Sequence, residues 1–538
     1  MLDSRLLLFL SMLACGNGND PADTSVENSD TGDTGGSDTV PTCDDGLALQ
    51  AFDASAEGSD YDGMVGDVTL TTLDGDWTLS ENWTGCDVYI FINYHPNLYI
   101  ADMFSSDVAE WLESSPRNVH WFFTAFSSSD STINEYINTM YTAIDQELND
   151  LEPELADHWR DRIHYVTDSA YDIGGGIGTI NSNYGLWGLG IDRHQTFREI
   201  GYLSDPATGW NTVPLEFLRY EAEIFNFEAN RQADLDAVDA TILTVFDDEH
   251  IADWGWAGKR GYAEVEFPDA TEMAEFDTLE MDLTLGCGHP EYDACPEWDY
   301  TIYAYLCDAD DPDNCGTEFG RWITAYAREG RWVHDVSPFL ADLKDGGTRK
   351  IGYYTTQGYD VTLTLRLSNQ GKTDAPNTMA YLWSGGTFNA DYNSNHEDIN
   401  FTPPAGTTRV ELMTVTSGHG YSSDPNNCGE FCNHQHEFTI NGQNSHTQEF
   451  PEANETYGCA DATSEIGVTP NQYGTWVYGR GGWCPGLEVS QWVVDITDEV
   501  TVAEENTIAY RGLLNGAERT VESTDGYIIL SSWLVYSQ

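Results

Sequence analysis

A short stretch bounded by two cysteines, Cys287–Tyr300 (CGHPEYDACPEWDY), carries the residues best suited to chemistry. It places Glu297, Trp298 and Asp299 directly before an alternating apolar run, Thr301–Leu306, which predicts a strand. An indole beside a carboxylate lowers the local polarity and can hold the acid at a pKa useful for catalysis. Taken alone, the same residues could form a solvated surface turn.

Two later cysteine-containing stretches present complementary side chains. Asn427–His436 (NCGEFCNHQH) surrounds Glu430, and Tyr478–Gly486 (YGRGGWCPG) contains Arg480 and Trp483. Tryptophan stacks on sugar rings, arginine and carboxylates bond hydroxyl or amide groups, and two acids provide general acid–base catalysis. Each loop singly could be an ordinary stapled turn. The three loops together indicate an extracellular site that handles sugars.

The cysteine spacing predicts five disulfides. Of the 11 cysteines, Cys15 lies in an N-terminal leader, which leaves an even number, as in proteins of an oxidising compartment. The chain contains no C-x-x-C pair, which argues against zinc, and we expect neither a metal nor a cofactor. Local spacing predicts four pairs, Cys287–Cys295, Cys307–Cys315, Cys428–Cys432 and Cys459–Cys484. The two cysteines that remain give the fifth pair, Cys43–Cys86.

Length and charge bound the function further. The chain has 538 residues, which predicts about three domains. Its 22 Lys and Arg against 91 Asp and Glu give a net charge of −69, which would repel nucleic acid and anionic membranes. Hydrophobic residues make up 40%, with 17 Trp and 29 Tyr, and this suffices for packed cores despite the charge. We therefore expect a folded protein that does not bind nucleic acid.

The N-terminus resembles an export signal. Residues 1–14 combine Arg5 with a short apolar run that could not span a bilayer, and the following Cys15-Gly16 resembles a bacterial lipobox. That resemblance implies a lipid on Cys15; a plain signal cut near Ala14 is the alternative. Residues 15–42 are polar and small, which predicts a flexible tether. The expected location is the cell envelope, with a lipid anchor in the outer membrane or at the cell surface.

Residues 43–231 predict an α/β domain. Apolar runs at 87–93 and 119–126 suit strands buried on both faces, and helical spacing at 107–113 and 133–151 separates and follows them. This order predicts a parallel sheet. Residues 66–205 also resemble the thioredoxin-like fold, but Asn93–Leu98 stands where that family carries its redox cysteines. The resemblance therefore implies a binding or spacer domain without redox chemistry.

From residue 240 onward, alternating apolar and polar residues replace helical patterns. The runs are broken by Gly, Pro, Asn and Asp, which predicts antiparallel strands. The residues suit two jelly-roll sandwiches of about eight strands each, at 241–368 and 376–538. The predicted fold class is thus mostly β, with two consecutive antiparallel jelly-roll sandwiches preceded by a smaller α/β domain.

Several segments of residues 241–538 resemble, in order and spacing, the peptide-N-glycosidase F family. They are CPEWDYTIYAYL, EFGRWITAY, HDVSPFLADLKDGGTRKI, TSGHG, NCGEFCNHQHEFTING, YGCAD and GRGGWCPGLEV. The family hydrolyses, without a metal, the amide between N-acetylglucosamine and asparagine. The resemblance implies N-glycosylated proteins or peptides as substrates and a monomeric enzyme. It also implies Asp299 as the essential catalytic acid, Glu430 as a second carboxylate, and substrate binding between the two jelly rolls by Trp298, His419, Arg480 and Trp483.

The chain departs from the family pattern at four places. Tyr354 stands where the family has a further functional glutamate, and Tyr300 replaces an arginine. One family tryptophan is missing from the stretch that ends at His419, and another is Phe431 here. Either the substrate differs or catalysis is lost.

Three alternatives follow from the same residues. A non-catalytic protein could bind glycans or proteins on this scaffold. A copper-dependent monooxygenase with related jelly rolls could use His434 and His436, which would lie on one side of a strand. The acidic run Asp308–Asp313 could bind calcium, although such runs are more often solvated loops.

Overall fold

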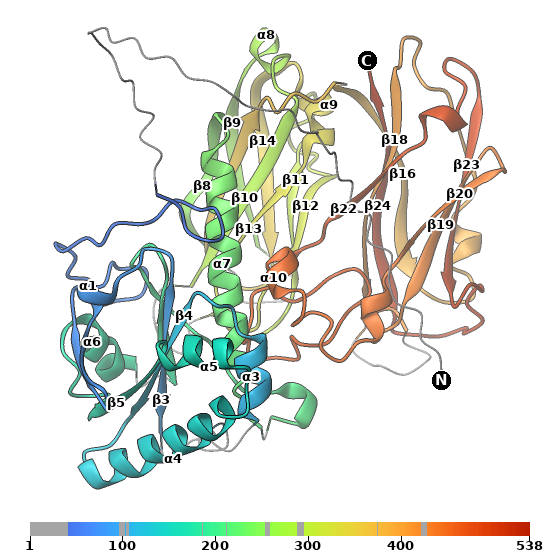
Figure 1. Cartoon of the computed structure of the whole chain (residues 1–538). Coiled ribbons are helices and arrows are strands. Elements are labelled where there is room, and N and C mark those ends of the chain that lie inside the picture. Colours follow the sequence, from blue (N-terminus) through green and yellow to red (C-terminus); the bar gives the residue numbers. More distant parts are fainter. Residues whose placement is uncertain are drawn as a thin grey trace, which may run out of the picture. The chain divides into compact units, whose positions relative to one another are not determined.

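The computed structural model describes residues 41–95, 103, 107–184, 187–210, 212–252, 259–287, 295–373, 375–420 and 428–538 (Figure 1). The expected signal, Cys15 and most of the expected tether lie outside these residues. Within them, no helix combines the length and apolar character needed to cross a membrane.

The N-terminal part of the described chain contains a mixed seven-stranded sheet in the order β2-β1-β5-β4-β3-β6-β7. Only the three central strands, β3, β4 and β5, are parallel, as predicted for the whole sheet. The strands that flank them pair antiparallel, β1 with β5 and β6 with β3, and hairpin-length connections then join β1 to β2 and β6 to β7. The strands are β1 (Thr69–Thr72), β2 (Gly75–Thr78), β3 (Val88–Tyr94), β4 (Val119–Ala125), β5 (Ile163–Ser169), β6 (Gly188–Ile191) and β7 (Phe197–Arg198).

Helices cover both faces of this sheet and complete its cores. Helix α4 buries an apolar stripe at helical spacing against β4 and β5. Helix α7 continues past the predicted domain end at residue 231, because its apolar positions continue to Leu235. The thioredoxin-like resemblance is not confirmed by any finding. The helices are α1 (Leu79–Asn82), α3 (Val108–Ser114), α4 (Asp130–Leu148), α5 (Pro153–Arg160), α6 (Gly175–Tyr184), η1 (Pro206–Thr208) and α7 (Phe217–Asp236).

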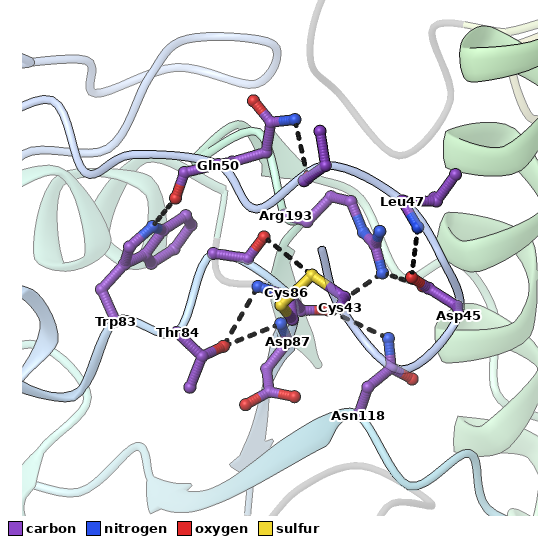
Figure 2. Close-up of a disulfide and its surroundings, with 12 residues drawn as sticks. Cys43, Asp45, Leu47, Gln50, Trp83, Thr84, Cys86, Asp87, Asn118 and Arg193 are labelled. Atoms are coloured by element: carbon purple, nitrogen blue, oxygen red, sulfur yellow. Dashed lines mark hydrogen bonds and ion pairs between the residues drawn. A yellow bond between two sulfur atoms is a disulfide. The ribbon is translucent and has the colours of Figure 1, made fainter. Parts of the chain in front are cut away.

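The disulfide Cys43–Cys86 ties the start of the described chain to Cys86, two residues before β3 (Figure 2). The carbonyl oxygen of Cys86 accepts hydrogen bonds from Arg193 Nη2 at 3.0 Å and from Asn118 Nδ2 at 3.1 Å. Arg193 also pairs with Asp45, two residues after Cys43. The disulfide and the ion pair therefore hold the same segment where β3 begins and β6 ends.

The first jelly roll packs two antiparallel sheets, in the orders β13-β10-β15-β8 and β21-β12-β11-β14-β9. Burial alternates along β10, where every second residue from Leu279 to Leu285 is enclosed. The strands are β8 (Ala240–Ile251), β9 (Lys259–Asp269), β10 (Thr278–Gly286), β11 (Thr301–Leu306), β12 (Thr317–Ile323), β13 (Gly330–Asp335), β14 (Gly346–Thr355), β15 (Tyr359–Ser368) and β21 (Leu487–Glu488). The short helices are α8 (Ala270–Met273), η2 (Ser337–Phe339) and α9 (Leu340–Leu343).

The second jelly roll has the sheet orders β16-β24-β18-β22 and β17-β23-β19-β20, again antiparallel. The two sandwiches confirm the predicted mostly-β class. The strands are β16 (Pro376–Thr387), β17 (Ile399–Phe401), β18 (Arg409–His419), β19 (His434–Ile440), β20 (Asn444–Glu449), β22 (Gln491–Asp495), β23 (Asn506–Leu514) and β24 (Tyr527–Ser537). The short helices are η3 (Asn393–Asn395), η5 (Pro451–Asn454), α10 (Thr463–Ile466) and η6 (Thr497–Glu499).

The long connection between β20 and β22 joins the two sandwiches. It includes α10, which packs beside α7, and β21, which pairs with β12 of the first jelly roll (Figure 1). Its apolar residues Cys459, Val468, Trp476 and Val477 belong to the core of the first jelly roll. This connection also carries Arg480 and Trp483, so both are held against residues from both sandwiches.

Candidate active site

Asp299 lies directly before β11, in a segment fixed by the residues that follow β12. Thr324 Oγ1 donates to the carbonyl of Trp298 at 2.8 Å, and the Thr324 N–H donates to the carbonyl of Tyr300 at 3.0 Å. The Tyr326 hydroxyl acts on the Asp299 carboxyl in the direction that lowers its pKa, and it lies 3.2 Å from Thr475 Oγ1. Burial raises the pKa of Asp299, while Arg480 and the Tyr326 hydroxyl oppose that rise. The backbone thus presents one largely enclosed carboxylate.

Glu430 is the second carboxylate and sits inside the loop closed by Cys428–Cys432. Its Oε2 accepts a hydrogen bond from the backbone N–H of Gly420 at 3.1 Å. Burial raises the pKa of Glu430 to about 7, against the effect of Arg480 and with a further contribution from the nearby Asp299. Two interacting acids of this kind titrate as a pair.

Arg480 joins the two acids, which come from different jelly rolls. Its Nε lies 3.2 Å from Glu430 Oε1, and its Nη2 lies 3.8 Å from Asp299 Oδ2. The guanidinium is fully buried and also donates to the carbonyls of Thr475 and Tyr478, at 3.0 and 2.8 Å. Because these bonds fix its plane, Arg480 holds both carboxylates in one arrangement.

Aromatic rings enclose this group. The Arg480 guanidinium lies over the rings of Phe431 and Trp483, at 4.8 and 5.0 Å from their centroids. The indole of Trp483 also stacks on His419, at 5.1 Å, and donates through Nε1 to the carbonyl of Gly418 at 2.6 Å. Trp483 is only 6% exposed. It therefore offers little free surface to a ligand, and its main contacts are with His419 and Arg480.

His419 is buried and lies between two aromatic rings. The Tyr527 ring stacks on its other side at 5.3 Å. Burial lowers the pKa of His419 to about 3, and the nearby arginines act in the same direction. The ring is therefore neutral at ordinary pH.

Trp298 differs from the other predicted site residues because half of it, 50%, is exposed. Its neighbour Tyr300 is 37% exposed. The site therefore combines an enclosed polar centre with exposed aromatic surface beside it, an arrangement suited to a sugar. Tyr354, which the family resemblance would align with a glutamate, packs against Tyr303 and beneath Arg260.

Three glycines pack around the imidazole of His434. A Cβ atom added to Gly418 would fall 2.2 Å from His434 Nε2, and one added to Gly481 would fall 2.4 Å from it. The carbonyl oxygen of Gly429 would also crowd both of these Cβ atoms. These glycines adjoin His419, Arg480 and Glu430 in the chain. The three backbone segments that carry those side chains thus converge on one buried ring.

The geometry of His434 and His436 does not favour the copper alternative. Both rings are buried, His434 Nδ1 bonds to His436 Nε2 at 2.7 Å, and His436 Nδ1 bonds to the Tyr510 hydroxyl at 2.7 Å. Their partners are thus each other and a tyrosine. One group of three metal-binding side chains is found in the described part of the chain, and two of its members are the disulfide-bonded Cys287 and Cys295.

The acidic run at 308–313 uses some of its oxygen atoms within its own loop. Asp308 Oδ1 accepts hydrogen bonds from the N–H groups of Asp310 and Asp311, at 2.8 and 3.4 Å. Cys307–Cys315 closes this loop, as expected, and the other four disulfides also have the predicted pairing. These contacts are those of a stapled acidic turn.

Sequence reasoning missed two residues that complete the site. Tyr326, which acts to lower the pKa of Asp299, lies within the quoted stretch EFGRWITAY, although nothing in that stretch marks its role. Tyr527, which stacks on His419, lies on β24, where no motif points to it. Only the pairing of β18 with β24 brings Tyr527 opposite His419.

Comparisons with known proteins find similarity to one described family and to one curated protein. Residues 387–535 match the family described as Peptide-N-glycosidase F, C terminal. The peptide-N(4)-(N-acetyl-beta-D-glucosaminyl)asparagine amidase F of Elizabethkingia miricola is 22% identical over 304 residues, which cover 51% of this chain and 77% of that protein.

Two solved structures are similar at low identity. PNGase F from Flavobacterium meningosepticum, a glycosylasparaginase, is 20% identical with a TM-score of 0.43, covering 56% of this chain and 96% of that one. PNGF-II is 13% identical with a TM-score of 0.42, covering 56% of this chain and 65% of that one. The match of residues 387–535 and the curated relative both support the resemblance of this chain to the peptide-N-glycosidase F family.

Proposed function

We propose that this protein is an amidase that hydrolyses the bond between N-acetylglucosamine and asparagine in N-glycoproteins or glycopeptides. The observation that carries this proposal is the contact of Arg480 with both Asp299 and Glu430. Such a group provides two carboxylates with raised pKa values and one fixed cation, which are the elements that amide hydrolysis needs.

In this proposal Asp299 is the primary acid–base residue and Glu430 positions the attacking water. Water adds to the amide carbon as the Asp299 carboxylate takes a proton from it. Arg480 stabilises the negative charge that develops on the carbonyl oxygen. The C–N bond then breaks and the nitrogen receives a proton. The products are an aspartate and a glycosylamine.

The exposed indole of Trp298 is the proposed stacking surface for a sugar ring. His419, Arg480 and Trp483 are the other proposed substrate-binding residues. Tyr300, Phe431 and Tyr354 alter the surroundings of the two acids, so we propose that the preferred glycan differs from that of the family.

A non-catalytic glycan-binding protein is the second candidate. Tyr354 favours it, because an aromatic side chain packed against Tyr303 supplies no third carboxylate. The two candidates differ in whether the glycosylated asparagine is converted.

The test uses the full chain, because α7 covers buried polar groups of the first jelly roll. The protein, oxidised, is incubated with a defined N-glycopeptide in ¹⁸O-labelled water, and the peptide is analysed by mass spectrometry. We expect ¹⁸O-labelled aspartate from the native protein and none from Asp299→Asn, whose thermal stability should change little.

The matched control is Asp308→Asn, which removes the same charge from the exposed acidic loop and should retain activity. Activity that survives in Asp299→Asn would remove the assignment. An unaltered glycopeptide with binding still measurable would favour the second candidate.

We also propose that the protein is exported as a monomer and anchored by a lipid on Cys15. Five disulfides support export, since they persist in oxidising compartments. Cys15→Ser should move the protein from the membrane fraction to the soluble fraction. Unchanged fractionation would contradict the anchor.

A further inference from the structure

A buried ion pair on β12 lies behind His419. Arg321 is fully enclosed and its Nη2 contacts Glu318 at 2.8 Å. Ser531 Oγ donates to Glu318 Oε2 at 2.8 Å, and Arg321 Nη1 donates to the carbonyl of Ile529 at 3.0 Å. The pair therefore belongs to the first jelly roll but is bonded to β24 of the second.

The same arginine reaches His419 through one hydroxyl. Arg321 Nη1 lies 2.9 Å from Ser417 Oγ, and that oxygen lies 2.8 Å from His419 Nε2. A guanidinium only donates hydrogen bonds, so Ser417 Oγ accepts from Arg321. The single hydroxyl hydrogen of Ser417 is then free to point at His419 Nε2.

The tautomer of the neutral imidazole depends on whether Ser417 donates to Nε2 or accepts a second hydrogen bond from it. If Nε2 accepts from Ser417, the hydrogen lies on Nδ1. Among the described residues none accepts a hydrogen bond from Nδ1. The Nδ1–H group is thus available to a ligand.

We propose that Glu318, Arg321 and Ser417 are positioning residues that fix His419 as the Nδ1–H tautomer, which donates a hydrogen bond to a carbonyl oxygen of the substrate. The donor role rests on the proposed amidase function; the tautomer does not. His419 lies beside the acids because the next residue, Gly420, donates to Glu430, and because His419 and Arg480 both pack against Trp483.

A neutral donor suits this place. Arg480 already supplies a positive charge, and burial holds the pKa of His419 at about 3, so the ring does not become a second cation at ordinary pH. A fixed neutral N–H group can stabilise the developing negative oxygen without its own ionisation. Trp483 and Tyr527 on the two faces of the ring keep the donor in one plane.

The tautomer is measured directly by ¹⁵N–¹H NMR of the full chain labelled at histidine. The His419→Gln variant assigns the signal by its loss. We expect a protonated Nδ1 and an unprotonated Nε2 in the native protein. Ser417→Ala and Arg321→Gln should each give a mixture of tautomers.

Ser532→Ala is the matched control. Ser532 is as buried as Ser417 and lies next to Ser531, but its hydroxyl donates to the carbonyl of Trp383. It should leave the His419 signal unchanged. A native protein with hydrogen on Nε2, or a Ser417→Ala variant with an unchanged tautomer, would overturn the positioning role whether or not the protein is an amidase.

Kinetics test the donor role separately. Ser417→Ala should lower kcat about 10-fold to 100-fold with little change in KM, because the interaction strengthens in the transition state. A shifted tautomer with unchanged kcat would overturn the donor role. Absence of any native activity, with the expected tautomer present, would refute the proposed function and leave the positioning result standing.

Discussion

Gly481 and His434 lie so close that a Cβ atom on Gly481 would fall 2.4 Å from the imidazole Nε2. The same added Cβ atom would lie 2.8 Å from the carbonyl oxygen of Gly429. No side chain fits there without movement of the backbone. The placement of Arg480, one residue earlier, therefore depends on a glycine at 481.

The substitution Gly481→Ala should displace Arg480 from the two acids. We expect a loss of about 1–3 kcal/mol in the free energy of unfolding, typical of overpacking, and a larger proportional loss of activity. Urea unfolding and the glycopeptide assay measure the two effects. Gly386→Ala, with nothing within 4 Å of its added methyl group, is the control. Native-like activity in Gly481→Ala would contradict the role of this contact.

The buried Glu430 should make stability depend on pH. Its folded pKa of about 7 lies above the unfolded value of about 4.5, so the folded state holds the proton more tightly. Its contribution to stability is greatest below pH 4.5 and falls by about 3 kcal/mol as the pH rises through 7.

Glu430→Gln removes that titration. The stability of the variant relative to the native protein should therefore rise between pH 4.5 and 8, as followed by urea unfolding at each pH. Glu504→Gln, at an exposed position, should give a flat difference. A flat difference for Glu430→Gln would show that the acid is solvated in the folded protein.

The two disulfides nearest the acids should contribute differently to stability and activity. Cys428–Cys432 closes a loop with a sequence separation of 4, and Cys459–Cys484 one of 25. Loop entropy predicts losses of about 2 and about 3.5 kcal/mol when each pair is replaced by serine.

The loss of activity should follow the opposite order and be larger when Cys428 and Cys432 are replaced, because their small loop carries Glu430 itself. Thermal unfolding and the glycopeptide assay on the two double-serine variants test this. Equal activity losses at equal stability would argue that neither loop positions the site specifically.

The α/β part should be coupled to the first jelly roll through Glu221 on α7. This side chain is fully buried and pairs with Arg328 at 2.8 Å, and Asn471 donates to it at 3.1 Å. Glu221→Ala leaves the buried arginine without its carboxylate and should cost about 3–5 kcal/mol of stability. Asp234→Ala, exposed on the same helix, should have little effect. Calorimetry compares them, and equal melting temperatures would mean that the ion pair contributes nothing.

Features set by nearby residues were predictable from the sequence. Alternating apolar residues predicted β11 at its observed bounds, and helical spacing predicted α4 to within a few residues. Cysteine spacing predicted the disulfides because short separations leave each cysteine few partners. The parallel sheet was only partly right, since β1 and β6, which flank the three central strands, pair antiparallel to them.

By itself, the sequence determined the sandwich class, the stapled loops and the two acids, because each depends on residue types over a short span. Only the tertiary structure decided that Arg480 contacts both Asp299 and Glu430, that His434 lies behind three glycines, and that Arg321 reaches His419 through Ser417. These contacts join segments far apart in the chain. Their formation depends on how two sandwiches and the connection between β20 and β22 pack, and local patterns carry no record of that packing.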